Sequence, residues 1–479
     1  MKLLIIYLCL GLTGLAHAQQ PNVIPAGYSV ETLDLPPGVQ LGATGLDVAA
    51  NGDVYVASRF GEVWRLRGSS WTLVAEGLHE ATGLLIDSDG LFVMQRPELS
   101  QLVDEDGDGV TDFYKTVSAG FGFSGNYHEY AFGPVRDKQG NFYGTLNLSH
   151  GGGTSVHGSI MHITEPYRGT CIKITPSGDC SVFAWGLRSP AGIGISPDDE
   201  LFYTDNQGDW NATSTLHHMV DGRFHGHPGS LKYHPDFKDR DLNAIKVEEY
   251  EALRTRPAIW IPHGAIANSP GNPEWDVTQG KFGPFAGQVF IGDQSRSNIF
   301  RVMLEKVGGE YQGGVINFID HLQCGVIRLA FAPDGSLWAG ETGRGWGSVG
   351  GKIDGLQRIV YDGRTVPFAL EHISLTADGF DLTFTHPVAG GEAVSAYAVE
   401  SWGYHYHGSY GSPLVDQKRF APTSVAVDGK TVHLKMPLEV NKVYRIGFDV
   451  LKGPAGEVAA SRSVYYTLNQ LRSSPARTE

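Results

Sequence analysis

A run of closely spaced acidic residues is the sharpest local motif in the chain. Its carboxylates occupy positions 1, 3, 5 and 9 of one loop: Asp104, Asp106, Asp108 and Asp112. Gly109 permits a sharp turn and Val110 would add its carbonyl oxygen, which matches the first part of a calcium loop of EF-hand type. Lys115 replaces the bidentate Glu at the last position, so the site would be completed from elsewhere. We predict a structural calcium site; the alternative is a solvated acidic turn.

A second set of polar residues is dispersed along the chain and could carry catalysis if folding brought it together. It consists of His128, Arg188, Asp205, Asn206, Gln207, Gly208 and Arg328. A histidine of near-neutral pKa can act as a general base, and an arginine can stabilise negative charge that develops on an oxygen. Each of these residues, taken alone, could equally be a satisfied polar residue of a channel.

Histidines are also concentrated in loops that could hold copper or zinc. The candidates are His150, His157, His162, His217, His218, His225, His227, His263, His405 and His407. Histidines two residues apart on a strand share one face, which suits a metal, but no pair comes with a clear third ligand. The chain has no nucleophile elbow, Walker loop, Rossmann fingerprint or haem-attachment motif.

One pattern recurs along the chain: an apolar-alternating strand, a turn that contains glycine, a second strand, and then Asp, Arg or Gly. The copies begin at Gly45, Gly83, Glu129, Gly192, Phe282 and Ile327. Six imperfect copies over roughly 300 residues predict one β-sheet blade each, arranged radially. We therefore expect a six-bladed β-propeller over residues 19–362. Its innermost strands would converge on a central channel and make neighbours of the dispersed polar residues.

The composition changes after this region. Short strands with turns every 8 to 12 residues predict an Ig-like β-sandwich over residues 363–470, followed by a disordered tail at 471–479. The predicted fold class is therefore all-β, a six-bladed β-propeller followed by a small C-terminal β-sandwich.

The N-terminus and the charge limit where the protein acts and what it binds. Residues 1–18 have a basic start, a short apolar run and a small-residue cleavage site, which predict a signal peptide and a secreted, periplasmic or extracellular protein. No stretch is long and apolar enough for a membrane span. The net charge of −15 argues against nucleic acid and anionic membranes as partners.

Two cysteines flank a predicted hairpin. Cys171 and Cys180 lie on either side of a Pro-Ser-Gly-Asp turn, so their sulfurs could face each other. In an oxidising compartment we expect them to form a disulfide, while Cys324 stays a buried free thiol.

Several of these segments resemble a known family. Residues 25–362 are similar to the six-bladed sugar dehydrogenases of the soluble quinoprotein glucose and sorbosone type. DNQGDWNATSTLHHMVDGRFHGHP, ETGRGWGSVGGKIDGLQRIVYDG and VESWGYHYHGSYGSP look more like the secreted dehydrogenase-like proteins of planctomycetes. The resemblance implies a propeller that holds pyrroloquinoline quinone (PQQ) and calcium.

The resemblance also implies roles for particular residues. His128 falls where the family's proton-abstracting His stands, and Arg188 matches the family's Gly-Leu-Arg-Asn-Pro motif. Gln207 and Gly208 match the Gln-Gly whose backbone helps to hold the calcium, and Asp205 and Asn206 precede them. Arg328 falls on one of two arginines that grip the quinone carboxylates.

The family's pattern is not fully kept. Ser189 replaces the Asn of the arginine motif, Asp209 replaces a Pro, and Val326 stands at the second arginine position. No equivalent of the quinone-clamping Lys is evident, although Arg296 could substitute for it.

These features predict an oxidoreductase that oxidises a sugar or polyol by general-base-assisted hydride transfer to the quinone. Its electrons would leave to a separate acceptor such as a cytochrome c. One alternative is a non-catalytic carbohydrate-binding propeller that stacks sugars on Trp210, Trp346 and the segment 402–407. Another is a polysaccharide lyase or a copper oxidoreductase on the same scaffold.

Overall fold

The computed structural model describes residues 24–151, 155–343, 345 and 347–472. The predicted signal peptide and residues 473–479 of the predicted tail lie outside the described residues. Strands dominate the chain, and its one α-helix within the described residues, α1 (Val247–Leu253), is short. The prediction of an all-β protein is confirmed.

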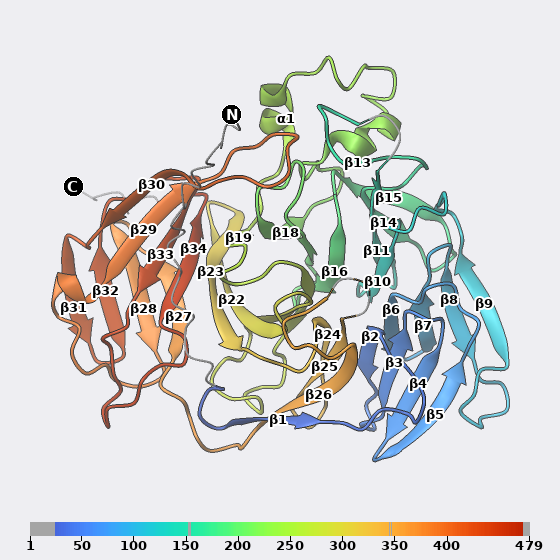
Figure 1. Ribbon diagram of the computed structural model, residues 1–479, viewed down its shortest axis with the longest axis horizontal. Helices are drawn as coiled ribbons and strands as arrows, with labels where there is room; N and C mark the ends of the chain where they lie inside the picture. The colour runs from blue at the N-terminus through green and yellow to red at the C-terminus, as the bar shows by residue number, and fades with distance from the viewer. Residues whose placement is uncertain (1–23, 152–154, 344, 346, 473–479) are drawn as a thin grey trace, which may run out of the picture.

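Six sheets surround one axis, as Figure 1 shows. From the axis outward, blade 1 contains β2 (Ala43–Val48), β3 (Val54–Ser58), β4 (Val63–Arg67) and β5 (Ser70–Ala75). Blade 2 contains β6 (Gly83–Asp87), β7 (Gly90–Met94), β8 (Leu99–Val103) and β9 (Phe113–Ser118). Blade 3 contains β10 (Ala131–Arg136), β11 (Phe142–Leu146), β14 (Thr170–Ile174) and β15 (Cys180–Trp185). Blade 4 contains β16 (Pro190–Ile195), β17 (Leu201–Asp205), β18 (Ser214–Met219) and β19 (Ile259–Ile261).

Blades 5 and 6 complete the ring. Blade 5 contains β20 (Pro270–Trp275), β21 (Val289–Asp293), β22 (Asn298–Val307) and β23 (Glu310–Ile319). Blade 6 contains β24 (Val326–Phe331), β25 (Leu337–Thr342), β26 (Asp354–Tyr361) and the N-terminal β1 (Tyr28–Thr32). β1 pairs antiparallel with β26, from Tyr28 opposite Tyr361 to Thr32 opposite Gln357. The start of the described chain therefore closes the ring onto its last blade.

Glycines at the starts of the predicted repeats explain how the innermost strands approach one another. A Cβ on Gly83 would lie 1.4 Å from the Gly133 carbonyl oxygen of the next blade, and one on Gly192 would lie 2.3 Å from Asn272. No side chain fits in that space, so these positions require glycine for the close approach of neighbouring backbones.

The connections carry the remaining small elements. β12 (Ser149–His150) pairs with β13 (Met161–His162) above blade 3, and the 3₁₀ helix η1 (Pro228–Tyr233) precedes α1 between β18 and β19. A second 3₁₀ helix, η2 (Val394–Ala396), lies in the C-terminal region.

A β-sandwich follows the propeller, and the two share one sheet. β29 (Ala398–Gly403), β30 (Val415–Phe420), β33 (Lys442–Gly447) and β34 (Ser463–Leu468) continue the sheet of blade 5, because β34 pairs with β23. The facing sheet contains β27 (Leu370–Leu375), β28 (Gly379–Phe384), β31 (Ser424–Asp428) and β32 (Thr431–Lys435). Buried Phe380, Phe384 and Tyr466 pack between the two sheets. The predicted architecture of a propeller followed by a sandwich is confirmed.

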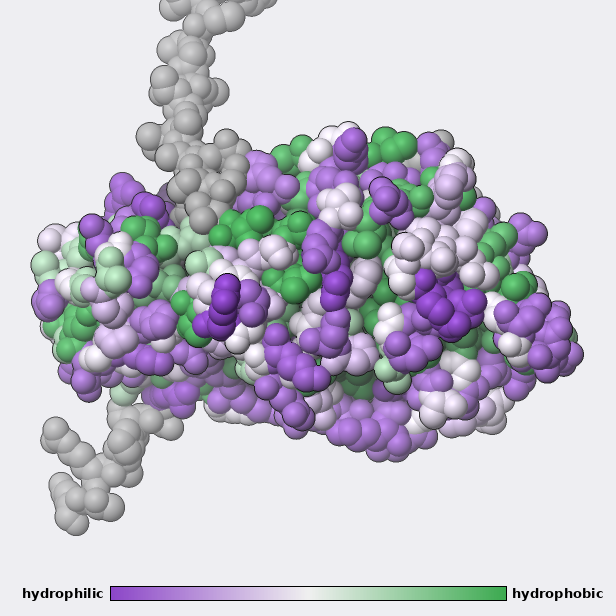
Figure 2. Space-filling view, turned by 90° about the horizontal axis from the view of Figure 1, so that it is seen from below, coloured by the Kyte–Doolittle hydropathy of each residue, from purple (hydrophilic) through white to green (hydrophobic). Residues whose placement is uncertain are grey.

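Hydrophilic residues cover most of the face in Figure 2, with apolar residues in small groups between them. Among the described residues, no helix has the length and apolar character needed to cross a bilayer.

The predicted disulfide is wrong. The hairpin of β14 and β15 forms as expected, but its register pairs Cys180 with Ile174 and Cys171 with Ala184. Side chains alternate between the faces of a strand, so the two cysteines lie on opposite faces of the blade and pack in different apolar clusters. Cys171, Cys180 and Cys324 are free thiols.

We therefore expect all three thiols to be alkylated when the protein is unfolded without reductant. Native protein should react more slowly, because burial raises the pKa of the Cys324 and Cys180 thiols to about 11. Mass spectrometry of the alkylated peptides makes the measurement. A linked peptide containing Cys171 and Cys180 would contradict the register.

Candidate functional site

One mouth of the central channel gathers polar side chains from three consecutive blades. Most of its lining residues precede the innermost strands β10, β16 and β20 or follow the second strands β11, β17 and β21, and the others lie on innermost strands. They are His128, Tyr130, Phe132, Asn147, Ser189, Ala191, Asn206, Ser269 and Gln294, with Ile327 of β24. We call this opening the His128 mouth. The repeat brings these residues together because each blade places the same turn at the same end of the axis.

His128 is held as a neutral imidazole. Its Nδ1 lies 2.9 Å from the carbonyl oxygen of Leu148, which can only accept, so Nδ1 carries the proton. In the neutral ring Nε2 then keeps its lone pair and can accept from the Ser189 hydroxyl, 3.3 Å away. Burial and the nearby Arg188 charge lower the pKa of His128 to about 4. An unprotonated Nε2 at the mouth is the arrangement that a general base requires.

Arg188 is fixed by a buried carboxylate. Its Nε donates to Asp209 Oδ1 at 2.7 Å, and His227 Nε2 lies 3.0 Å from Asp209 Oδ2. His227 Nδ1 accepts from the Gly229 amide, so its Nε2 carries the proton and donates to Asp209. Burial opposes ionisation of Asp209, but the hydrogen bond from His227 and the charge of Arg188 outweigh it and hold the pKa of Asp209 well below its usual range.

Gly208 has a packing role in this arrangement. A Cβ at Gly208 would lie 2.0 Å from the Arg188 guanidinium carbon, so only glycine leaves room for that side chain. The guanidinium also lies 5.5 Å from the ring centroid of Tyr410, which comes from the sandwich. The predicted neighbourhood of Arg188 and the Gln-Gly turn therefore exists, with a carboxylate and a tyrosine that were not predicted.

Asp205 and Gln207 point away from the mouth. Asp205 accepts the backbone amides of Arg188 and Ser189, each at 2.8 Å, and so holds both residues at the start of β16. Asp293 does the same in blade 5 for Ser269, which marks this aspartate as a feature of the blade. Gln207 donates from Nε2 to the Ala212 carbonyl oxygen.

Two amide oxygens face the mouth without a donor. Asn147 Oδ1 and Asn206 Oδ1 are buried and have no hydrogen-bond partner among the described residues. Buried polar atoms are nearly always satisfied, so the pair has room for a hydroxyl group or a hard cation. Asn206 was predicted to contact a cofactor, and Asn147 was missed.

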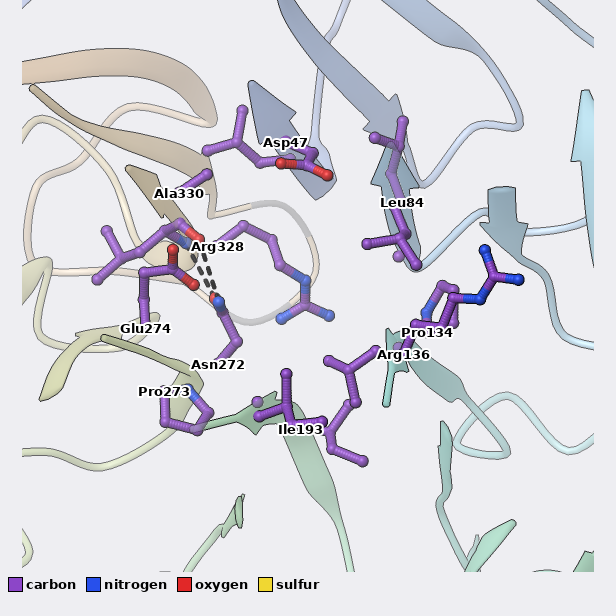
Figure 3. A pocket seen from close by; sticks show the side chains of 18 of the residues that line it. Asp47, Leu84, Pro134, Arg136, Ile193, Asn272, Pro273, Glu274, Arg328 and Ala330 are labelled. Carbon is purple, nitrogen blue, oxygen red and sulfur yellow. Dashed lines mark hydrogen bonds between the residues drawn. The ribbon is translucent and has the colours of Figure 1, made fainter. Parts of the chain in front are cut away.

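Arg328 lies deeper in the channel and does not line the His128 mouth. It donates to the carbonyl oxygens of Ala191, Ile327 and Thr82, which belong to different blades or the turns before them. Figure 3 shows it within the cavity at the opposite end of the channel, about 480 Å³ in volume, with Asp47 and Glu274 nearby. Its contacts favour a structural role, in which one cation ties three blades together.

Two arginines at the rim were not predicted. Arg59 donates to the Tyr130 hydroxyl at 2.9 Å, and the Arg96 guanidinium lies 5.4 Å from the Tyr130 ring centroid. Glu80 forms ion pairs with both arginines. Arg59 and Arg96 follow β3 and β7, as Asn206 follows β17, so an alignment of the repeats would have found them.

The acidic loop lies between β8 and β9, on the outer part of blade 2. Ligand oxygens of Asp104, Asp106 and Asp108 lie within 4.8 Å of one another, and this is the one such group among the described residues. Asp112 instead accepts the Glu105 amide, and Val110 is exposed. The loop is thus folded as a calcium loop in its first part, and calcium binding stays a prediction.

If the loop binds calcium, millimolar calcium should raise the melting temperature by several degrees, because a ligand that binds only the folded state stabilises it. Asp106→Ala should remove most of that shift, since one of three converging carboxylates is lost. Asp416→Ala, an exposed carboxylate on the sandwich, serves as the control. Differential scanning calorimetry makes the measurement, and a chelator without effect on wild-type protein would contradict the site.

The other histidines do not assemble into a metal site of histidines, cysteines and carboxylates within the described residues. His217 and His225 are buried, with ring centroids 5.3 Å apart; His217 stacks on the Tyr203 ring, and His225 meets the same ring edge-on. His405 and His407 lie 6.3 Å apart by ring centroid on the surface loop of the sandwich. The copper or zinc alternative therefore gains no support.

Two of the three tryptophans expected to stack on sugars are almost fully buried. Trp210 and Trp402 are each 3% exposed and pack inside the protein. Trp346 lies outside the described residues.

Comparisons with known proteins agree with this fold. A family described as a domain of unknown function (DUF7133) matches residues 69–258. A structure from Thermus thermophilus, described as an oxidoreductase (glucose dehydrogenase), is 18% identical, covers 70% of this chain and 100% of its own, and has a TM-score of 0.50. Another glucose dehydrogenase is 14% identical, covers 69% and 98%, and also has a TM-score of 0.50.

The PQQ-bound aldose sugar dehydrogenase from Streptomyces coelicolor is 15% identical, covers 71% and 99%, and has a TM-score of 0.49. A comparison with curated protein sequences gives no match. The chain thus shares its propeller fold with the two structures of TM-score 0.50 and adds a sandwich joined to its fifth blade.

Proposed function

We propose that this protein is a secreted oxidoreductase that oxidises a sugar or related polyol at the His128 mouth. The observation that carries the proposal is the unprotonated Nε2 of His128 beside the Arg188 cation, in a mouth lined with hydroxyl and amide groups. A neutral base and a fixed cation suit removal of a hydroxyl proton and stabilisation of the resulting oxyanion.

The chain's own residues would act in a defined order. A substrate hydroxyl takes the place of the Ser189 hydroxyl at His128 Nε2 and gives its proton to that nitrogen. The N–H at Nδ1 stays hydrogen-bonded to the Leu148 carbonyl oxygen, which keeps the imidazole oriented. Asp209 and His227 hold Arg188 in place, so the guanidinium need not reorganise as charge develops.

The residues at the mouth fit a quinone with calcium. Arg59, which donates to the Tyr130 hydroxyl of the mouth, could hold a carboxylate group of PQQ, with Glu80 offsetting part of its positive charge. The unpartnered Asn147 and Asn206 oxygens are the kind of ligand that calcium prefers. PQQ, when bound, would accept the hydride from the substrate carbon, and its electrons would pass to a separate acceptor such as a cytochrome c.

Reconstitution tests the proposal. Purified protein would be mixed with PQQ and calcium, its absorption spectrum recorded, and aldoses and polyols assayed with an artificial dye acceptor. A quinone spectrum and turnover are expected. The absence of both would overturn the proposal, and glycan binding without turnover would favour the carbohydrate-binding alternative.

A further inference from the structure

A groove of about 860 Å³ separates the propeller from the sandwich. We call it the interdomain groove. His263 and Gln207 line it from the propeller, and Glu400, Tyr404, Arg419 and Arg445 line it from the sandwich. Its floor is one face of the sheet that runs from blade 5 into the sandwich, so the shared sheet fixes both walls.

Four residues form a row across this floor. Arg419 on β30 lies opposite Glu400 on β29, Glu400 lies opposite Arg445 on β33, and Arg445 lies opposite Tyr465 on β34. Residues directly opposite one another in a sheet share a face. The row therefore presents two guanidiniums, one carboxylate and one phenol ring to the same groove.

The charges in this row do not cancel. Arg419 Nη2 lies 2.9 Å from one oxygen of Glu400, and Arg445 Nη1 lies 3.7 Å from the other. Two cations thus share one carboxylate, which leaves a positive groove on a chain of net charge −15. Arg445 Nε is buried and has no acceptor among the described residues. A buried N–H without an acceptor is a rare feature, and an oxygen of a bound ligand or water would satisfy it.

The groove and the His128 mouth lie on the two sides of one turn. Gln207 lines the groove, and its neighbour Asn206 lines the mouth, so the turn after β17 separates the two spaces. The loop that joins β29 and β30 reaches from the sandwich to this turn (Figure 1), where the Gly411 amide donates to the Gly208 carbonyl oxygen at 2.9 Å. One extended ligand could occupy both spaces.

We propose that the interdomain groove binds an anionic oligosaccharide, one whose units carry carboxylate or sulfate groups. The inference rests on the proposed function, because it places the reacting end of that oligosaccharide at the His128 mouth. Carboxylate and sulfate oxygens match the donors of Arg419 and Arg445, and the Tyr404 ring, which lines the groove, packs against a sugar ring. The sandwich thus contributes half of the substrate site.

Calorimetric titration tests this inference without any need for turnover. Uronic-acid oligosaccharides, sulfated oligosaccharides and neutral oligosaccharides of equal length would be titrated into the full chain. Binding of one charged set is expected, weakened by salt. Arg419→Ala should raise the dissociation constant about tenfold, because a charge-assisted contact is lost. Arg419 is 75% exposed at its side chain, so the variant should fold.

Lys435→Ala is the matched control, because this exposed cation lies on β32 of the facing sheet. It should leave the dissociation constant unchanged. Equal binding of neutral oligosaccharides, no binding of either charged set, or an unchanged dissociation constant in Arg419→Ala would overturn the inference. Turnover of aldoses without binding of anionic oligosaccharides would support the proposed oxidoreductase function and contradict the inference about the groove. Binding without turnover would support the inference about the groove and contradict the proposed function.

Discussion

Replacing His128 with alanine is expected to lower kcat/KM for sugar oxidation by about 10²- to 10⁴-fold, the range that a general base supplies. The fold should be unchanged, because His128 packs at the rim of the mouth and its backbone amide keeps its bond to Asn126. His150→Ala is the control: the two ring centroids lie 6.0 Å apart, and His150 is exposed. Steady-state kinetics of the reconstituted enzyme makes the measurement.

The pH profile gives this prediction a second readout. Burial and the Arg188 charge lower the pKa of His128 to about 4, so the imidazole stays unprotonated as the pH falls through the ordinary histidine range. The acidic limb of kcat/KM should therefore lie near pH 4 and not near pH 6.5. Wild-type activity in the His128→Ala variant would contradict the role of His128 as base. An equal loss of activity in the His128→Ala and His150→Ala variants would contradict it as well.

Removing the buried carboxylate of Asp209 should have the largest effect on stability. Asp209→Ala leaves Arg188 and His227 without their shared partner, and breaking a buried ion pair costs about 3–5 kcal/mol. Asp198→Ala, an exposed carboxylate of the same blade, should change stability by less than about 0.5 kcal/mol. Urea unfolding followed by fluorescence gives both values.

Activity measurements distinguish the contribution of Asp209 to stability from its role in positioning Arg188. Since Asp209 positions Arg188, the variant should also lose turnover at temperatures where it remains folded. A loss of stability below about 1 kcal/mol would contradict the buried ion pair. Normal turnover in a folded variant would show that Arg188 does not depend on Asp209.

The sequence predicts the architecture well because the propeller repeats a local pattern. Gly83 and Gly192 mark places where neighbouring backbones must approach closely, and each repeat places its turn at the same end of the axis. The same regularity places His128 and Ser189, the residue after Arg188, at one mouth. It also explains why Asp205 was taken for a cofactor ligand, although the structure uses it, like Asp293, to hold the start of an inner strand.

The parts that could not be predicted depend on contacts between distant segments. Asp209 becomes a partner of Arg188 only when η1 brings His227 to it, and Tyr410 reaches Arg188 only because β34 joins the sheet of blade 5. The hairpin around Cys171 contains a bulge, and strand alternation puts this cysteine on the far face from Cys180. Spacing along the chain carries no information about such contacts.

A crystal structure of the protein soaked with PQQ, calcium and a sugar tests the central claim most directly. That claim is that the chemistry takes place where His128 and Arg188 meet at one end of the channel. We predict ligand density within hydrogen-bonding distance of His128 Nε2 and beside the Arg188 guanidinium. Density confined to the cavity beyond Arg328, with the His128 mouth empty, would contradict it.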